Sequence, residues 1–166
     1  MKKLTMIMTI LMAVTIASAY AVTNTSTIVL VSVVNEVKPQ YVLRNTETGE
    51  MGSTVVYSTD AITEGDVKTS FEVVQSNNSN YRGNVELTIS ATELMAKVEG
   101  KLYSTEGVAI MMNGNNVGNR ANVNVEYTST VKAGTVINAF DVIWTTNTNL
   151  VNATYEAAVT LNYTAA

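Results

Sequence analysis

The fold is decided by the stretch near the end of the sequence that reads Thr154-Tyr155-Glu156-Ala157-Ala158-Val159-Thr160-Leu161-Asn162-Tyr163. Every second side chain from Tyr155 on is apolar or aromatic. Successive side chains of a strand point to opposite faces, so the pattern predicts a strand with one face on a core and the other in water. The expected core face consists of Tyr155, Ala157, Val159, Leu161 and Tyr163. We expect no further strand after it, and an open apolar edge is a place where another chain can pair.

Composition limits the class of protein. The 166 residues are enough for one domain with a sizeable core, and 46% hydrophobic against 14% charged residues argues against disorder. The chain contains no Cys and no His, which removes disulfides, thiolate metal sites and the usual general base. Asp60, Glu64 and Asp66 lie close in sequence, but their spacing matches no EF-hand loop, so we interpret them as an exposed acidic turn. The sequence therefore predicts no enzymatic activity, no cofactor and no metal.

Residues 1–21 have the pattern of a signal peptide. Lys2 and Lys3 precede an apolar run from Leu4 to Ile16, and Ala17-Ser18-Ala19 is a small-x-small cleavage site, with Ala19-Tyr20-Ala21 as the alternative. The run is shorter than the ~20 residues that span a bilayer. We expect an exported chain with no membrane insertion. Loss of the two lysines takes the formal net charge from −4 to −6, and with no basic patch visible nucleic acid is not an expected partner.

The segment Ile28-Val29-Leu30-Val31-Ser32-Val33-Val34 has high β-propensity and contains no charge, Gly or Pro. Both of its faces are apolar. It is either a strand buried on both faces within its own sandwich or a strand that inserts into another molecule. Exposed on its own, such a segment would be an aggregation hazard.

The middle of the sequence predicts many short strands separated by turns rich in Asn, Gly, Ser and Thr. This spacing is typical of an antiparallel β-sandwich. Only residues 91–97 have a composition that allows a helical turn or two. Trp144 alternates with Phe140 and Val142, which favours a place in the core over a sugar-stacking platform. The expected strands are 53–58, 67–75, 83–91, 109–112, 121–128, 135–145 and 154–163.

These features together resemble the chaperone–usher pilins of Gram-negative bacteria. The likeness rests on the final strand with its near-terminal Tyr163, on Val131-Lys132-Ala133-Gly134-Thr135, and on the run from Ile28 to Val37. That run is most similar to the cysteine-free branch that includes the CS1/CFA-type major pilins. The sequence departs from other pilins in lacking a disulfide, in having three residues after Tyr163 rather than one, and in having no Gly in the N-terminal segment, where Ser32 can supply the small side chain.

The resemblance implies an Ig-like antiparallel β-sandwich that lacks its last strand. It divides the chain into a signal peptide (1–21), an N-terminal donor-strand extension (22–36) and an Ig-like pilin domain (37–166). The extension of one subunit would add main-chain hydrogen bonds and side chains to the groove of the next, so that a head-to-tail fibre grows. The inserted side chains would be Ile28, Leu30, Ser32 and Val34, and a one-residue slip would exchange them for Thr27, Val29, Val31 and Val33. The groove edge would be Tyr155, Ala157, Val159, Leu161 and Tyr163.

The resemblance also implies partners and a location. The partners are copies of the chain or sister pilins, a periplasmic chaperone and an outer-membrane usher during assembly, and a host receptor where the fibre supports adhesion. The location is a fimbria on the bacterial cell surface, reached through the periplasm. The alternative from another class is a self-contained secreted β-sandwich that binds a ligand such as a host glycan through its loops. The two hypotheses differ in whether residues 28–34 enter a neighbour or the chain's own sheet.

Overall fold

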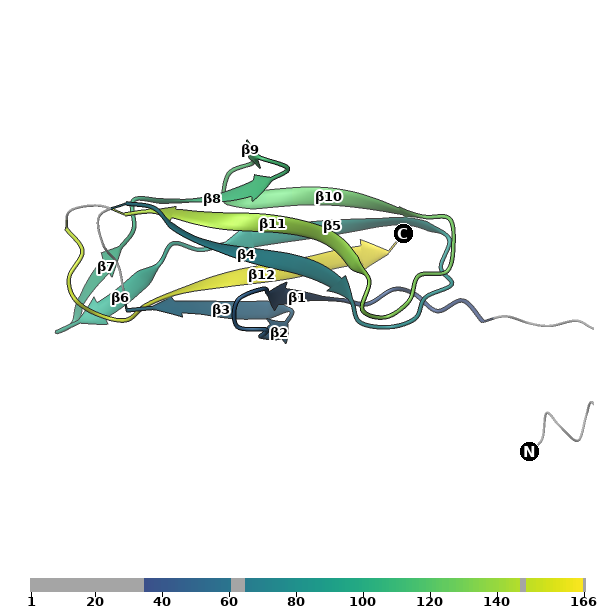
Figure 1. The fold of residues 1–166 in the computed structure, drawn as a ribbon, viewed down its shortest axis with the longest axis horizontal. Helices are drawn as coiled ribbons and strands as arrows, with labels where there is room; N and C mark the ends of the chain where they lie inside the picture. Colours follow the sequence, from purple (N-terminus) through teal and green to yellow (C-terminus); the bar gives the residue numbers. More distant parts are fainter. Residues whose placement is uncertain (1–34, 61–64, 147–148, 166) are drawn as a thin grey trace, which may run out of the picture. The chain divides into compact units, whose positions relative to one another are not determined.

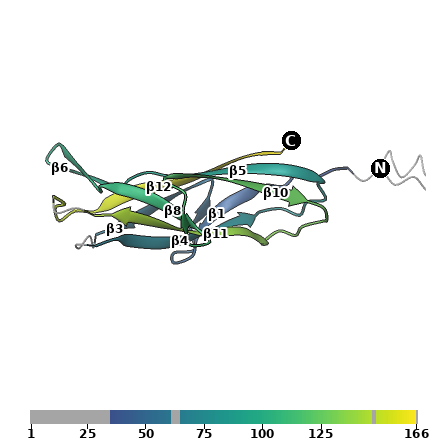
Figure 2. The ribbon, with the colours of Figure 1, turned by 90° about the horizontal axis from the view of Figure 1, so that it is seen from above.

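The computed structural model describes residues 35–60, 65–146 and 149–165, and these form two antiparallel β-sheets packed as a sandwich (Figure 1). Seen from above, the sheets form two layers (Figure 2). The described residues contain no helix. Their strands are β1 (Tyr41–Asn45), β2 (Met51–Gly52), β3 (Thr54–Thr59), β4 (Val67–Gln75), β5 (Gly83–Ala91), β6 (Met95–Val98), β7 (Lys101–Ser104), β8 (Gly107–Met112), β9 (Asn115–Asn116), β10 (Arg120–Tyr127), β11 (Val136–Thr145) and β12 (Tyr155–Ala165).

The strand order is that of an Ig-like sandwich. The first sheet runs β2-β1-β4-β11-β8-β9, so β1, β4, β11 and β8 take the A-B-E-D positions of an Ig domain. The second sheet runs β10-β5-β12-β6-β7, and the neighbours β5 and β12 take the C and F positions. The remaining strand, β3, pairs with β12. The predicted all-β, Ig-like antiparallel sandwich is confirmed.

The core lies between the sheets and is made by the alternating side chains that the sequence pattern indicated. On β5, Val85, Leu87 and Ile89 are fully buried, while Glu86 is exposed on the outer face. Trp144 of β11 is also fully buried, so its predicted place in the core is confirmed. Each fully buried aliphatic side chain of this kind stabilises the fold by ~1.5–3 kcal/mol.

All seven expected strands are present. The ranges predicted for β4 and β5 agree with the structure, and those for β3, β8, β10, β11 and β12 agree to within two residues at each end. Five strands were not predicted: β1, β2, β6, β7 and β9. They have two to five residues each, too few for alternation to stand out from chance.

The expectation of a helical turn in residues 91–97 is wrong. The backbone there is extended because tertiary partners use its polar groups. The carbonyl oxygen of Thr92 accepts the indole N–H of Trp144 at 2.8 Å, and the N–H of Thr92 donates to the carbonyl oxygen of Ala158 at 3.0 Å. Leu94 is fully buried, which fixes this segment as the link from β5 to the β6–β7 hairpin.

The chain passes from one sheet to the other between β2 and β3. Strand β2 pairs with β1 in the first sheet, and β3 pairs with β12 in the second, with only Ser53 between them. Gly52 lies at this crossing, where an added Cβ atom would come within 2.9 Å of the carbonyl oxygen of Thr54. The close approach explains why glycine occupies this position.

Candidate strand-docking site

The two edges of β12 can be assigned from its hydrogen bonds. The N–H of Leu161 donates to the carbonyl oxygen of Ser53 at 2.8 Å, on the side of β3. The carbonyl oxygen of Ala158 accepts from Thr92, on the side of β5. Backbone groups alternate in direction along an antiparallel strand, so the odd-numbered residues of β12 face β3 and the even-numbered residues face β5.

The β3 side of β12 is paired along only part of its length. The ladder with β3 joins Tyr155–Thr160 to Thr54–Thr59, and the bond from Leu161 to Ser53 extends it by one residue. Beyond that bond, no strand of the described residues pairs with β12 on this side. On the other side β5 continues alongside as far as Ala165. The backbone N–H and C=O of Tyr163 therefore lie on an open sheet edge, to which a further strand can add.

The predicted core face of β12 divides into a buried part and a rim. Tyr155, Ala157, Val159 and Leu161 are buried between the sheets, as the alternation indicated, whereas Tyr163 is 39% exposed. The ring of Tyr163 lies edge-on against Tyr41 of β1, with ring centroids 4.8 Å apart. At the open edge, this aromatic pair bridges the seam between the two sheets.

A chain of buried hydrogen bonds lies next to this seam. Tyr41 donates its hydroxyl proton to the hydroxyl oxygen of Tyr127, which in turn donates to Oε1 of Gln75, both at 2.7 Å. The amide nitrogen of Gln75 donates to the carbonyl oxygens of Asn77 and Val131. Burial raises the pKa of the Tyr41 and Tyr127 hydroxyls above their ordinary value, and donation to Tyr127 raises that of Tyr41 further. Each side chain in this series of hydrogen bonds has a partner. The series therefore holds β1, β4 and β10 together at the end of the sandwich where Tyr163 lies.

The entry into β1 is held by the loop after β4. The side chain of Asn77 accepts from the N–H of Gln40 at 2.8 Å and donates to the carbonyl oxygen of Lys38 at 3.0 Å. Ser79 donates to the carbonyl oxygen of Val37 at 2.7 Å. These bonds fix the residues that lead into β1, at the start of the sandwich. Sequence reasoning found only a turn here, since an Asn-rich turn carries no sign of the distant backbone that it binds.

The start of β12 has a further mark of an Ig domain. The Tyr155 hydroxyl accepts from the N–H of Val151 at 3.0 Å and donates to its carbonyl oxygen at 3.1 Å. A tyrosine at the start of strand F that binds the backbone a few residues upstream is the tyrosine corner of Ig sandwiches. This supports the assignment of β12 as strand F. In a complete Ig sheet, strand G lies beside F, and along β12 that position is held by β3 and then by the open edge.

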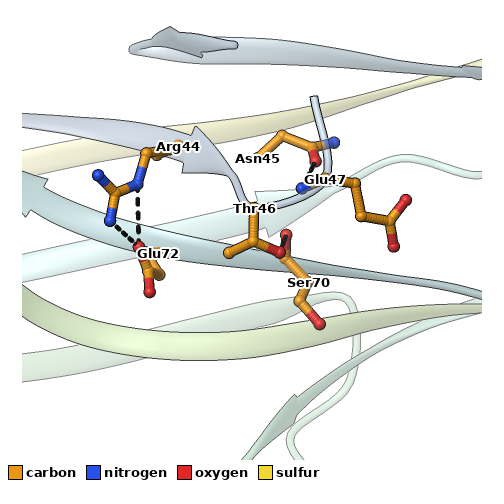
Figure 3. Close-up of polar contacts among 6 residues, drawn as sticks. All are labelled: Arg44, Asn45, Thr46, Glu47, Ser70 and Glu72. Carbon is orange, nitrogen blue, oxygen red and sulfur yellow. Dashed lines mark hydrogen bonds and ion pairs between the residues drawn. The ribbon is translucent and has the colours of Figure 1, made fainter. Parts of the chain in front are cut away.

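The outer face of the first sheet carries polar contacts between its strands. On the first sheet Arg44 forms an ion pair with Glu72, and the hydroxyl of Thr46 donates to the carbonyl oxygen of Ser70 at 3.1 Å (Figure 3). Asp141 accepts from Ser70 at 2.6 Å and forms an ion pair with Lys68 at 2.7 Å, and these two contacts hold the pKa of its carboxyl below the ordinary value. Cross-strand pairs of this kind stabilise a solvated sheet face.

One open hollow of about 400 Å³ lies on the second sheet and bears on the ligand-binding alternative. It has no aromatic side chain on which a sugar ring could stack. Within the described part of the chain, no three His, Cys, Asp or Glu side chains lie close enough together to hold a metal ion. The hollow is lined by Asn84, Glu86, Asn122, Val123, Asn124 and Thr164.

The predicted donor residues Ile28, Leu30, Ser32 and Val34 lie outside the described residues. The structure thus describes β12 and its open edge, but not the segment that was predicted to dock on it. Compared with known proteins, the chain matches no family model and no curated protein. Among the described residues there is no helix with the length and apolar character needed to cross a membrane.

Proposed function

We propose that the protein is a structural subunit of a bacterial surface fimbria, polymerising head-to-tail by donor-strand exchange. The observation that carries the proposal is the open edge of β12 beyond the bond from Leu161 to Ser53, as far as Ala165, at the position of strand G beside an F-type strand. The sequence supplies a matching donor in the apolar segment 28–34. A strand that adds to an open edge gains main-chain hydrogen bonds, and its alternate side chains enter the core.

The proposal includes the partners that this assembly needs. A chaperone would cover the acceptor edge in the periplasm, because an open edge invites aggregation. An outer-membrane usher would then exchange the chaperone for the next subunit. The contact between subunits is heterologous and does not close, so it propagates as a fibre on the cell surface. Support for adhesion to a host would follow from display of the fibre.

One observation favours a second candidate, a self-contained secreted β-sandwich that binds a ligand. Strand β3 already covers β12 from Tyr155 to Thr160, and four of the five predicted groove residues are buried within the chain's own core. On this alternative the sandwich is complete without a donor. The polar hollow on the second sheet would then be the first place to look for a ligand.

Thermal unfolding of a truncated chain that begins at Asn35 separates the two candidates. It is measured alone, with a synthetic Val22–Val34 peptide, and with the same peptide carrying Leu30→Glu as a control. The fibre proposal expects a low melting temperature that rises strongly with the native peptide only. Donor-strand exchange would be excluded if the truncated chain had the same melting temperature as the full mature chain and neither peptide changed that temperature.

A further inference from the structure

The inference concerns β3, and it rests on the proposed function. Strand β3 occupies the N-terminal half of the edge that a donor strand needs, through a ladder of six residue pairs from Tyr155↔Thr59 to Thr160↔Thr54. A donor cannot hydrogen-bond to the odd-numbered residues of β12 there while β3 does. Either the donor uses the open half alone, or β3 gives up its ladder.

The length of the candidate donor decides between these possibilities. The apolar segment 28–34 has seven residues, but the open half extends only from Leu161 to Ala165, and Leu161 already donates its N–H to Ser53. Tyr163 and Ala165 are the residues of this half with both backbone groups on the open side. A donor confined there would be longer than the edge it pairs with, so part of its apolar length would stay unpaired and in water, which the hydrophobic effect opposes.

Strand β3 makes few contacts for a strand of this sandwich. It pairs with β12 alone, so its other edge has no strand beside it among the described residues. Val55 is its one fully buried side chain, and Tyr57 adds a ring stacked on Trp144 with centroids 5.1 Å apart. On the outer face, the hydroxyls of Thr54 and Thr160 lie 3.2 Å apart. A seven-residue donor with three large aliphatic side chains on its inserted face would replace these contacts with more buried apolar area.

We propose that β3 is a displaceable cover of the acceptor edge. It holds β12 from Tyr155 to Thr160 in the free subunit and releases this ladder when a donor segment docks. The donor starts at the open end of β12, at Tyr163 and Ala165, and advances toward Tyr155, so the exposed half is the entry point and the covered half supplies the rest of the site. The cover keeps the free subunit's edge short, which limits uncontrolled pairing.

A disulfide between β3 and β12 tests the proposal directly. Val56 and Ala158 are directly opposed, and their side chains lie on the outer face. The odd-numbered residues make the hydrogen bonds between these strands, so this is a non-hydrogen-bonded pair, whose Cα separation of ~4.5 Å suits a disulfide. The chain contains no Cys, so V56C/A158C would hold the only two thiols.

The matched control is T88C/N122C, which links β5 to β10 away from the acceptor edge. These residues are also directly opposed on the outer face, and their side chains are hydrogen-bonded at 3.0 Å. Thr88 uses its backbone groups toward β12, so this pair too is non-hydrogen-bonded. Both variants are made in the chain of residues 22–166. Each is studied oxidised and reduced, which compares two states of one folded protein.

The readouts are the rate of capture of a fluorescent Val22–Val34 peptide and the growth of oligomers in size-exclusion chromatography. We expect oxidised V56C/A158C to capture peptide and to assemble at least tenfold more slowly than its reduced form, and oxidised T88C/N122C to behave like the wild type. Equal rates for the oxidised and reduced V56C/A158C, in a chain that does assemble, would overturn the role of β3 and leave the fibre proposal intact. If the wild type neither captures peptide nor assembles, the fibre proposal fails and the role of β3 falls with it.

Discussion

A Cβ atom at Gly83 would lie 2.8 Å from the hydroxyl oxygen of Tyr81. Gly83 begins β5 with φ at +139°, a conformation that L side chains rarely adopt, and Tyr81 is buried edge-on against Tyr127. We therefore expect Gly83→Ala to lower the free energy of unfolding by ~1–3 kcal/mol, through backbone strain and displacement of the Tyr81 ring. Urea denaturation measures the change.

Gly107→Ala is the control, because an added Cβ atom at Gly107 meets nothing within 4 Å. Its effect is expected to stay within about 0.5 kcal/mol of zero. Equal losses in the two variants would mean that the contact with Tyr81 does not set the requirement for glycine at residue 83.

The buried chain from Tyr41 through Tyr127 to Gln75 predicts a second effect. Tyr127→Phe leaves Oε1 of Gln75 and the hydroxyl of Tyr41 without their partner, and we expect a loss of ~1–3 kcal/mol in the free energy of unfolding. Tyr41→Phe removes one donor of the same chain. The double variant should therefore lose less than the sum of the two single losses, whereas strict additivity would show that the hydroxyls act independently.

Alkaline pH should destabilise the fold through the same hydroxyls. The folded pKa of Tyr41 is raised above the unfolded value of about 10, so its contribution is fully present below pH ~10 and is lost as the pH rises beyond it, where only the unfolded chain ionises readily. Denaturation series from about pH 7 to 11 should show a plateau and then a decline. Tyr41→Phe should make that decline shallower. A decline of the same slope in this variant would assign the effect to other groups.

Tyr155→Phe should also destabilise the sandwich, because it leaves the N–H and carbonyl oxygen of Val151 without the hydroxyl that pairs with both. We expect a loss of ~1–3 kcal/mol in the free energy of unfolding. Tyr103→Phe serves as the control, since the described residues offer its hydroxyl no partner. If Tyr155→Phe has as small an effect as the control, the tyrosine corner contributes nothing to stability.

The alternation of β5 and β12 was sufficient to predict their ranges to within two residues and most of their buried faces, because each packs one face on the core. Tyr163 is the exception, since it lies at the exposed rim of β12. The same logic missed β1, in which the third inward residue is the polar Asn45, buried because its side chain accepts the N–H groups of Glu47 and Thr48. It also missed the partner of β12. Thr54 of β3 and Thr160 of β12 are 106 residues apart, and no local sequence pattern predicts which distant strand will pair with β12. The tyrosine chain was missed for the same reason, since its members lie on separate strands.

The register of the donor strand decides which of its side chains enter the groove. On the preferred register Leu30 enters the groove and Val31 faces outward, and a one-residue slip reverses them. In the chain of residues 22–166, Leu30→Glu should then weaken assembly by more than about 100-fold, because a carboxylate buried without a partner costs several kcal/mol and each 1.4 kcal/mol is a factor of ten. Val31→Glu should assemble within a few-fold of the wild type.

The matched pair makes the outcome specific, because the two variants have the same charge and neighbouring positions and differ only in the face that they alter. Sedimentation velocity measures assembly, and thermal melting of each monomer controls for folding. Loss of assembly in Val31→Glu alone would assign the slipped register, with Val29, Val31 and Val33 inserted. Equal assembly in both variants would show that neither face enters a groove, and the segment would then have no role as a donor strand.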